Sequence, residues 1–579
     1  MRIALAILLA AAGTAVQAVE PLVNLDNARY NGVDQGDGVT KWLGIRYGAA
    51  PVGDLRFRAP QDPEPSTDVV EANKFGPICP PQQPGDFTVS PDAPDRFTVD
   101  EDCLFLSVFA PTNATTETKL PVLFWIQGGG FTSNSNANYD ATDLVKDGNI
   151  IVVQINYRVG MYGFLQSKEV EADGSLNNGI KDMIKALEWV QTNIEKFGGN
   201  KDRVVIDGLS AGGSAVALLL AANNGTLNLF AGGIIESGGW TTMRSMQQGQ
   251  EQYDCLAAEK NCSASASAST LACLRSLDAS ALRSSQCWFG PHIDHDLFTG
   301  PLLSMYASGR VAAVPTIMGA CANEGTKYSA PETTATTADA HAYFLNQDPS
   351  LTNASLALLD ALYIDQPAPV FPGKGAKFRQ TANAIADAGT HCIIKALQNA
   401  LAAKNASTYA YRYAVRDPAD ERAGYGVWHG VNAYAVWGPD RTDGAPPASY
   451  VGGAEAPNAR AVGVTRAYWT SFVRSLDPNA GRAAVLGAPE WRPWTGGGDG
   501  ERERLVIRTN GTGMERMTSA QSLRCDAIYG FSEALGEPRS GGEKTELDGV
   551  VAAEALAARD CGFDDGCAGQ GMVRRMFSA

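Results

Sequence analysis

The fold prediction rests on one stretch, Val204-Val205-Ile206-Asp207-Gly208-Leu209-Ser210-Ala211-Gly212, and on the apolar run 215–220 that follows it. Its first residues predict a buried strand, and the run after the last glycine predicts a helix. A serine at such a tight strand-to-helix turn holds its hydroxyl clear of the backbone, and the first amides of the helix point toward the atom it attacks. The Gly-x-Ser-x-Gly pattern alone is weak in a chain with 61 glycines. The strand before it and the helix after it make Ser210 a candidate nucleophile.

Strand-like and helix-like segments alternate along the rest of the chain. Short β-rich segments are expected at 104–109, 122–126, 150–155, 234–235 and 314–318. Between them, apolar residues recur at helical spacing from Asn178 to Phe197. This alternation predicts an α/β fold with a large, mostly parallel central sheet and helices on both faces.

The two ends of the chain differ in composition from its centre. Arg2, the short apolar run 3–12 and Val16-Gln17-Ala18 form the three parts of a secretory signal peptide, so residues 1–18 are expected to be removed. Past Tyr529 the composition shifts toward Gly, Glu, Ala and Arg, which predicts a main domain over 19–530 and an appendage over 531–579. No later stretch is long and apolar enough to span a membrane, and the last residues carry no anchor or retention signal.

Composition points to a secreted protein. Eleven cysteines are typical of an oxidising compartment. The formal net charge of −16 argues against binding to nucleic acid or to anionic membrane surfaces. We therefore expect a disulfide-bearing glycoprotein of undetermined oligomeric state, with candidate glycosylation sites at Asn113, Asn224, Asn261, Asn353, Asn405 and Asn510.

A serine nucleophile needs a base, an orienting carboxylate and an anion hole. The expected strand 122–126 runs directly into Gln127-Gly128-Gly129-Gly130-Phe131. Three glycines after a central strand let backbone amides point outward without side chains in the way. Alone, this loop is as readily an ordinary flexible turn. Paired with the serine turn, it predicts an oxyanion hole.

The base and the acid are constrained mainly by their order in the chain. Three histidines follow Ser210, namely His341, His391 and His429, and order alone leaves all three open as the base. His429 lies in a loop of small residues. Glu324 follows the strand 314–318 and precedes His429, which makes it the candidate acid.

Two further histidines, His292 and His295, lie three residues apart in Pro291-His292-Ile293-Asp294-His295. This spacing could indicate a metal site. Without a clear third ligand, however, the two are expected to be residues of a surface loop.

The chain resembles the type-B carboxylesterase/lipase family, the cholinesterase-like branch of the α/β-hydrolases, and most of all its secreted fungal members. The resemblance covers nearly the whole mature chain to about Tyr529. Its motifs are specific when taken together: Pro51-Val52-Gly53-Asp54-Leu55-Arg56-Phe57, Glu101-Asp102-Cys103-Leu104, Gly128-Gly129-Gly130-Phe131, Asn156-Tyr157-Arg158-Val159-Gly160, Phe197-Gly198-Gly199-Asn200, 208–213, Asn323-Glu324-Gly325-Thr326, Tyr468-Trp469-Thr470-Ser471-Phe472 and Asp477-Pro478-Asn479.

The resemblance implies Ser210 as nucleophile, His429 as base and Glu324 as acid. It also implies that the amides of Gly129, Gly130 and Ala211 form the oxyanion hole, and that Ser237 supports the triad from behind. It implies no metal and no organic cofactor. Two positions depart from the family pattern. Gln127 stands where many members carry His, which affects the acyl side of the pocket, and Lys181-Asp182-Met183 replaces the usual Asp-Gln.

The resemblance also implies contacts that stabilise the scaffold. Buried charges need partners, so Arg56 is expected to pair with Glu101, and Arg158 with Asp182. The implied disulfides are Cys79–Cys103, Cys262–Cys273 and Cys392–Cys525. Five cysteines remain, so at least one is free or pairs between chains; they are Cys255, Cys287, Cys321, Cys561 and Cys567, of which Cys561 and Cys567 are the expected pair.

The sequence predicts a secreted serine carboxylic-ester hydrolase that takes a small-molecule or lipid ester. One alternative is a true triacylglycerol lipase with an interfacial lid. The loop between Cys79 and Cys103 would be that lid, but its many prolines and aspartates make a poor amphipathic helix and favour soluble esters. A remote alternative is a non-catalytic, cholinesterase-like binding protein, although such relatives usually lack a triad residue.

Overall fold

The computed structural model describes residues 18–83, 98–134, 139–239, 243–263, 269–348, 351–442, 444–481, 487–495 and 502–535. Nearly all of the predicted signal peptide, most of the predicted lid loop and the Cys561–Cys567 pair lie outside these ranges. The expected boundary after residue 530 falls inside a helix, α17 (Ser519–Leu535). The appendage therefore stays a prediction.

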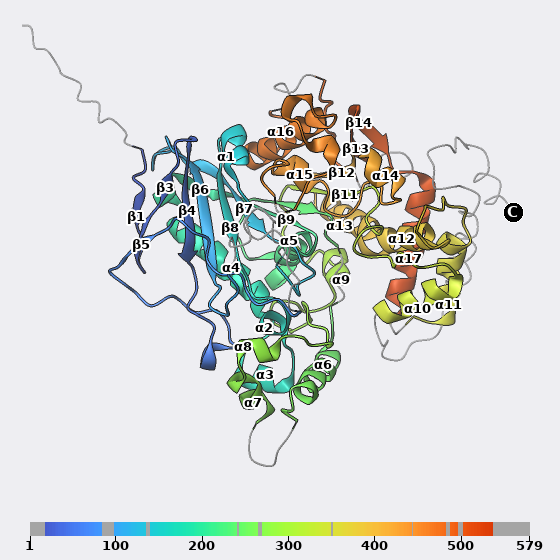
Figure 1. The fold of residues 1–579 in the computed structure, drawn as a ribbon, viewed down its shortest axis with the longest axis horizontal. Helices are drawn as coiled ribbons and strands as arrows, with labels where there is room; N and C mark the ends of the chain where they lie inside the picture. Colours follow the sequence, from blue (N-terminus) through green and yellow to red (C-terminus); the bar gives the residue numbers. More distant parts are fainter. Residues whose placement is uncertain are drawn as a thin grey trace, which may run out of the picture.

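Within the described residues, eleven strands form one large sheet, which crosses the centre of the molecule in Figure 1. Their order is β14-β13-β12-β11-β10-β9-β7-β8-β6-β4-β3, and a separate small sheet has the order β1-β2-β5. The strands are β1 (Leu22–Asn24), β2 (Arg29–Asn31), β3 (Val33–Asp34), β4 (Val39–Arg46), β5 (Val69–Glu71), β6 (Phe105–Pro111), β7 (Leu120–Ile126), β8 (Ile151–Ile155), β9 (Gly199–Leu209), β10 (Gly232–Glu236), β11 (Thr316–Cys321), β12 (Thr408–Ala414), β13 (Glu503–Arg508) and β14 (Gly511–Arg516).

The strand directions confirm the predicted α/β class. From β8 to β13 every neighbouring pair is parallel. The pairs β8–β6, β6–β4, β4–β3 and β13–β14 are antiparallel, so the sheet is mixed at both edges. Antiparallel neighbours need only short connections, whereas the parallel strands are joined through helices. The carboxyl ends of the central strands therefore meet along one edge of the sheet.

Helices cover both faces of this sheet (Figure 1). On one face α5 packs against β9 and β10, and on the other α16 packs against β7 and β9. A further group, α10, α11, α12 and α17, gathers beyond the β14 end of the sheet. The helices are α1 (Thr142–Gly148), α2 (Gly160–Phe164), α3 (Lys168–Asp173), α4 (Asn178–Asn193), α5 (Ala211–Ala221), α6 (Met246–Glu259), α7 (Thr270–Ser276), α8 (Ala279–Leu282), α9 (Leu302–Ala307), α10 (Thr337–Gln347), α11 (Asn353–Leu359), α12 (Phe378–Ala386), α13 (Cys392–Ala403), α14 (Pro418–Arg422), α15 (Ala433–Val436), α16 (Ala459–Ser475) and α17, with short 3₁₀ or π turns at Gly53–Leu55, Ile194–Phe197, Ala222–Gly225, Asp360–Ile364, Asp387–His391, Ala448–Tyr450 and Gly453–Glu455.

The central strands are apolar on both faces because both faces are covered. In β7, Val122, Phe124 and Ile126 join the core on the α5 side. The alternate residues Leu123 and Trp125 join the core on the α16 side. This division explains the near-continuous apolar runs in the sequence, which are typical of parallel strands buried on both faces.

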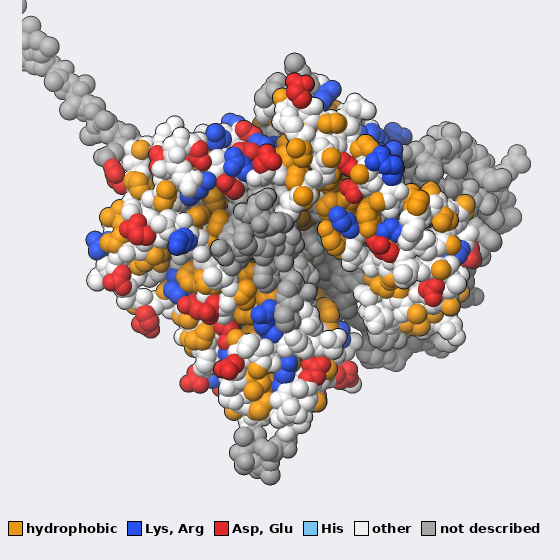
Figure 2. Space-filling view, viewed as in Figure 1, with side chains coloured by type: hydrophobic (Ala, Val, Ile, Leu, Met, Phe, Trp, Pro, Cys, Tyr) orange, Lys and Arg blue, Asp and Glu red, His pale blue; other side chains and the backbone are white. Residues whose placement is uncertain are grey.

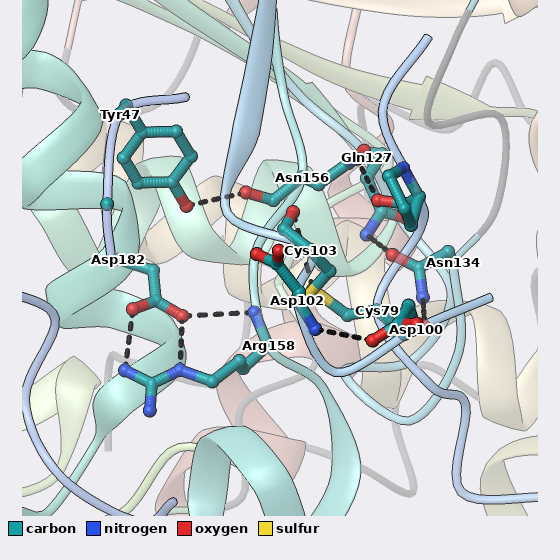
Figure 3. Close-up of a disulfide and its surroundings, with 12 residues drawn as sticks. Tyr47, Cys79, Asp100, Asp102, Cys103, Gln127, Asn134, Asn156, Arg158 and Asp182 are labelled. Carbon is teal, nitrogen blue, oxygen red and sulfur yellow. Dashed lines mark hydrogen bonds and ion pairs between the residues drawn. A yellow bond between two sulfur atoms is a disulfide. The ribbon is translucent and has the colours of Figure 1, made fainter. Parts of the chain in front are cut away.

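Two buried ion pairs brace the scaffold, as predicted. Arg56 pairs with Glu101 through Nε–Oε1 at 2.7 Å. Arg158 pairs with Asp182 through two bonds of 2.8 and 2.7 Å, and the side chains are only 2% and 0% exposed. Figure 3 shows the second pair near the Cys79–Cys103 disulfide. Because both partners are buried together and bidentate, neither charge is left unpaired.

The structure contains the disulfides Cys79–Cys103, Cys262–Cys273 and Cys392–Cys525. It also joins Cys255 to Cys287, a pair that the sequence analysis left unassigned. Cys321 is a free, buried thiol. The third predicted bridge closes the longest loop and fixes α13 to α17, so it connects the core to the last described helix.

The described surface carries no large field of one sign on the face drawn in Figure 2, where acidic and basic side chains are intermixed. All six candidate glycosylation asparagines are exposed. Among the described helices, none has the length and apolar character needed to cross a bilayer.

Candidate functional site

Ser210 lies at the turn between β9 and α5. Its backbone has φ 61° and ψ −125°, a conformation that non-glycine residues rarely adopt. The Ser210 amide donates to the Glu236 carbonyl oxygen at 2.8 Å, which anchors the turn to β10. The flanking glycines are needed for space: a Cβ on Gly208 would lie 2.4 Å from the backbone of Gly212, and one on Gly212 would lie 2.1 Å from the Ile126 oxygen.

The three predicted triad residues form one hydrogen-bonded chain. His429 Nε2 lies 2.8 Å from Ser210 Oγ. His429 Nδ1 is hydrogen-bonded to Glu324 Oε2. Glu324 is 3% exposed, whereas a quarter of the His429 side chain is exposed. These residues follow β9, β11 and β12, so the carboxyl edge of the parallel strands brings them together.

Direct contacts between the acid loop and the histidine loop fix their spacing. Asn323 Oδ1 accepts a hydrogen bond from the Val427 amide at 2.9 Å, and the Asn323 amide donates to the Val427 oxygen at 2.9 Å. Thr326 Oγ1 donates to the Tyr425 oxygen at 2.7 Å. Gly426 has φ +60°, and a Cβ there would lie 2.3 Å from Asn323 Oδ1. This close approach requires glycine.

The other histidines do not join the triad. His341 contacts Asp360 at 2.8 Å, and His391 contacts both Asp387 and the Cys321 oxygen at 3.0 Å. The sequence predicts that His292 and His295 are both residues of a surface loop, and this is confirmed for His295 but wrong for His292. His295 is exposed, but His292 is only 1% exposed and its Nδ1 faces the Gly290 oxygen.

The described residues give no histidine metal site. Among them, one group of possible metal ligands comes together, Cys255, Glu259 and Cys287. Its two cysteines form a disulfide, so they offer no thiolates.

The electrostatics suit a neutral serine beside a basic histidine. Burial raises the pKa of Glu324, but the charge of His429 and hydrogen bonds from His429 and Ser237 outweigh it, and the net pKa lies below the usual value. For His429, burial lowers the pKa, but the charge of Glu324 and its hydrogen bond together outweigh burial and raise the pKa above its usual value. Glu324 is therefore ionised and His429 is a stronger base than free histidine.

The glycine loop after β7 lies beside the serine. A Cβ on Gly128 would lie 2.7 Å from the Leu209 oxygen and 3.0 Å from Ser210 Cβ. Gly129 and Gly130 both have positive φ, at 103° and 63°. Within the described residues, nothing accepts a hydrogen bond from the amides of Gly129, Gly130 or Ala211. These amides are thus candidate donors to an anionic oxygen.

Ser237 and Gln127 support this arrangement from behind. Ser237 Oγ donates to Glu324 Oε1 at 2.6 Å. Gln127 is fully buried, and its Nε2 donates to Asn134 Oδ1 at 2.9 Å. Asn134 in turn donates to the Cys79 oxygen at 2.6 Å, so this departure from the family pattern connects the glycine loop to the disulfide (Figure 3).

Sequence reasoning missed a group of buried polar residues directly behind the triad. It consists of Asp207, Glu236, Cys321 and Asn432. Asp207 carried a signal, because it is a charged residue at the end of an otherwise apolar strand. The other members of the group could not be identified from the sequence, because they come from three other segments of the chain.

The chain is similar to known proteins in both sequence and structure. "Lipase 1" of Geotrichum candidum is 37% identical over 362 residues, 54% of this chain and 64% of its own length, so the match spans less than two thirds of that relative. "Secreted lipase 1" of Botryotinia fuckeliana is 30% identical over 79% of this chain and 84% of its own length. The crystal structure of Aspergillus niger EstA superposes with a TM-score of 0.81 at 34% identity, covering 90% of this chain and 99% of EstA.

A profile of the carboxylesterase family matches residues 20–526, which includes every residue of the site described above. The matched range holds the serine turn, the glycine loop and both partner loops, and it ends within α17. This chain belongs to the carboxylesterase family.

Proposed function

We propose that this protein is a secreted serine carboxylic-ester hydrolase that works through an acyl-enzyme. Ser210 is the nucleophile, His429 the general base and Glu324 the orienting acid. The observation that carries the proposal is the hydrogen-bonded chain from Ser210 Oγ through both nitrogens of His429 to Glu324. The relatives named as lipases and esterases favour an ester substrate.

The chemistry follows from these positions. Neutral His429 accepts the proton of Ser210 as the serine oxygen attacks the ester carbonyl, and Glu324 stabilises the imidazolium. The amides of Gly129, Gly130 and Ala211 stabilise the oxyanion, each contributing about 3–4 kcal/mol in comparable sites. His429 then gives its proton to the leaving alcohol. Water, activated in the same way, hydrolyses the acyl-Ser210 bond and releases the carboxylic acid.

Secretion and glycosylation belong to the same proposal. The predicted signal peptide, four disulfides among the described residues and six exposed sequons suit an extracellular protein. Expression in a secreting host, with N-terminal sequencing and glycosidase treatment, tests these points. A mature chain that starts at Met1 would contradict them.

Covalent labelling tests the proposed nucleophile directly. Diethyl p-nitrophenyl phosphate should release one p-nitrophenolate per chain and leave a diethylphosphoryl group on Ser210, located by peptide mass spectrometry. Hydrolysis of p-nitrophenyl esters should stop in step with labelling. Label on another residue, or activity that survives full labelling of Ser210, would overturn the assignment.

Esterase and lipase are separated by a second experiment. We propose soluble esters as the main substrates, so rates on p-nitrophenyl esters should fall with acyl chains too long to dissolve. They should not rise when an emulsified triacylglycerol interface is added. A sharp rise in rate at that interface would favour the lipase alternative, which the names of several relatives also suggest.

A further inference from the structure

Two buried carboxyls lie side by side behind the proposed nucleophile. Asp207 is on β9 and Glu236 is on β10, and both are on the face of the sheet that α16 covers. The register places Asp207 opposite Ile234, so Glu236 is its diagonal neighbour on that face. Asp207 is 0% exposed and Glu236 is 1% exposed. The two carboxyls are therefore buried neighbours whose charges interact directly.

The two carboxyls have different surroundings. Glu236 accepts hydrogen bonds from Trp469 Nε1 at 2.9 Å and from Asn432 Nδ2. No described side chain donates a hydrogen bond to Asp207, and no described lysine or arginine pairs with either acid. Two adjacent carboxylates cannot both remain ionised in a dry interior without a cation. The arrangement therefore needs at least one proton. Asp207 carries this proton and donates a hydrogen bond through it to Glu236, which has two other hydrogen-bond donors.

This pair connects to all three loops of the triad. The backbone carbonyl oxygen of Glu236 accepts a hydrogen bond from the Ser210 amide at 2.8 Å. Asn432, three residues after His429, bridges Glu236 and Cys321: its Oδ1 accepts from Cys321 Sγ at 3.4 Å. The Cys321 amide donates to Glu324 Oε1 at 2.5 Å. A displacement of Asn432 would therefore change the positions of the serine, the acid and the histidine together.

We propose that Asn432 is a positioning residue for the triad, held between Cys321 and an Asp207–Glu236 carboxyl pair that keeps one shared proton. The part that concerns rates rests on the proposed function. The part that concerns the proton rests on the buried pair alone.

Among the residues that the structure describes, no other group facing the pair supplies a compensating positive charge. From β12, Tyr411 lies nearby, and burial together with Glu236 raises its pKa. From β11, burial and then Glu324 raise the pKa of the Cys321 thiol. The neighbours from α16 and β7 are the uncharged Trp469 and Trp125. Burial and then the charge of Glu236 raise the pKa of Asp207, and burial raises that of Glu236 to about 7.

The first test is Asn432→Ala. Loss of the bridge should lower kcat about 10²-fold, as expected for a misplaced catalytic group, with KM largely unchanged. Thr465→Val is the matched control, because Thr465 is equally buried and its hydroxyl bonds only to the Ala461 oxygen of its own helix. The control should keep kcat. If Asn432→Ala keeps kcat while losing only thermal stability, the positioning role is wrong.

The second test is Asp207→Asn, whose amide can donate to Glu236 without a shared proton. A buried acid that stays protonated only in the folded state makes folding less favourable as pH rises above about 4. The Tm of the variant relative to wild type should therefore rise steadily between pH 4.5 and 8. Parallel Tm curves would overturn the shared proton.

Infrared spectroscopy of the wild-type protein keeps the proposal testable if a variant does not fold. With ¹³C-labelled aspartate, a protonated carboxyl band should persist at neutral pH, and its absence would overturn the proposal. Failure of the proposed function is distinguishable, because it would appear as missing phosphoryl label on Ser210 while the Tm and infrared results stand.

Discussion

Buried carboxylates are handled differently in two regions of the molecule. In the scaffold beside β6 and β8, Asp182 and Glu101 each accept two hydrogen bonds from one arginine. Behind the triad, Asp207 and Glu236 face each other with no described lysine or arginine between them. The first arrangement satisfies each charge locally. The second satisfies charge only through a proton and through residues of neighbouring loops.

The difference separates stability from activity. Opposite-charge pairs in the scaffold hold segments together, and among the described residues none of the hydrogen bonds of these side chains reaches the proposed triad. The pair behind the triad is a local conflict between burial and charge, and such conflicts are concentrated at functional sites. We therefore expect changes at the triad to lower the rate of hydrolysis without unfolding the protein. Changes in the scaffold should lower stability while the rate per folded molecule stays near wild type.

The largest effect is expected for Ser210→Ala. Removal of the nucleophilic oxygen should lower kcat on p-nitrophenyl esters by about 10⁶-fold. Because only one hydroxyl oxygen is lost and the backbone turn is kept, Tm should stay close to that of wild type. A variant that retains most of its rate, or that unfolds, would contradict the proposed separation.

Glu324→Gln comes next. The imidazolium loses its counter-charge, so kcat should fall by about 10⁴-fold, as for the aspartate of a serine protease triad. The acid limb of the pH–rate profile should also move. In wild type, Glu324 raises the pKa of His429, so the base becomes protonated at a higher pH than free histidine would. Without that charge the limb should shift to lower pH, and an unchanged limb would show that another carboxylate is the partner.

Arg158→Leu tests the scaffold. The change leaves the Asp182 charge buried and unpaired, which typically costs about 3–5 kcal/mol of unfolding free energy. Urea unfolding should show this loss, while kcat per folded molecule stays near wild type. The double variant Arg158→Leu/Asp182→Leu is the control, since removing both charges should recover most of the stability. A large fall in kcat with unchanged stability would contradict the separation of stability from activity between the two regions.

Much of this separation could be predicted from the sequence. The serine turn followed from a local pattern of glycines between an apolar strand and a helix. His429 could be chosen among three histidines only through family resemblance, because the histidine and acid loops meet through contacts such as Asn323–Val427 that leave no periodic signal. The two arginine pairs and three disulfides rested on the same resemblance.

What the sequence could not supply depends on tertiary contacts. At the antiparallel edge the sequence predicted the strand at 104–109, which is β6, but it predicted neither β3 nor β4 nor the direction in which these strands pair. Cys255 and Cys287 are separated by 32 residues in a region with no matching motif. Asn432 and Trp469 meet Glu236 from two distant segments, so the group behind the triad becomes visible only in three dimensions.

The smallest effect is expected at the β13–β14 hairpin. There Glu515 is surrounded by arginines, whereas Asp207 has no cationic neighbour among the described residues. Glu515 contacts Arg412 at 2.7 Å, Arg504 at 2.8 Å and Arg508 at 3.0 Å. Burial raises its pKa, but the hydrogen bonds and charges of Arg412 and Arg504 outweigh burial and lower the pKa to about 2. A lowered pKa gives stability that is complete above the unfolded-state value of about 4.3 and is lost as pH falls toward 2.

Glu515→Gln should therefore cost about 2 kcal/mol at pH 7, the size of a hydrogen bond to a charged group. The loss should shrink as pH falls below about 4, the reverse of the trend expected for Asp207→Asn. Glu503→Gln is the matched control on the same hairpin, because Glu503 pairs with the half-exposed Arg492 and such surface pairs contribute little. Urea unfolding of the three variants at pH 3, 5 and 7 measures both slopes. If Glu515→Gln and Asp207→Asn change stability with the same sign of pH dependence, surrounding charge does not distinguish the two buried acids.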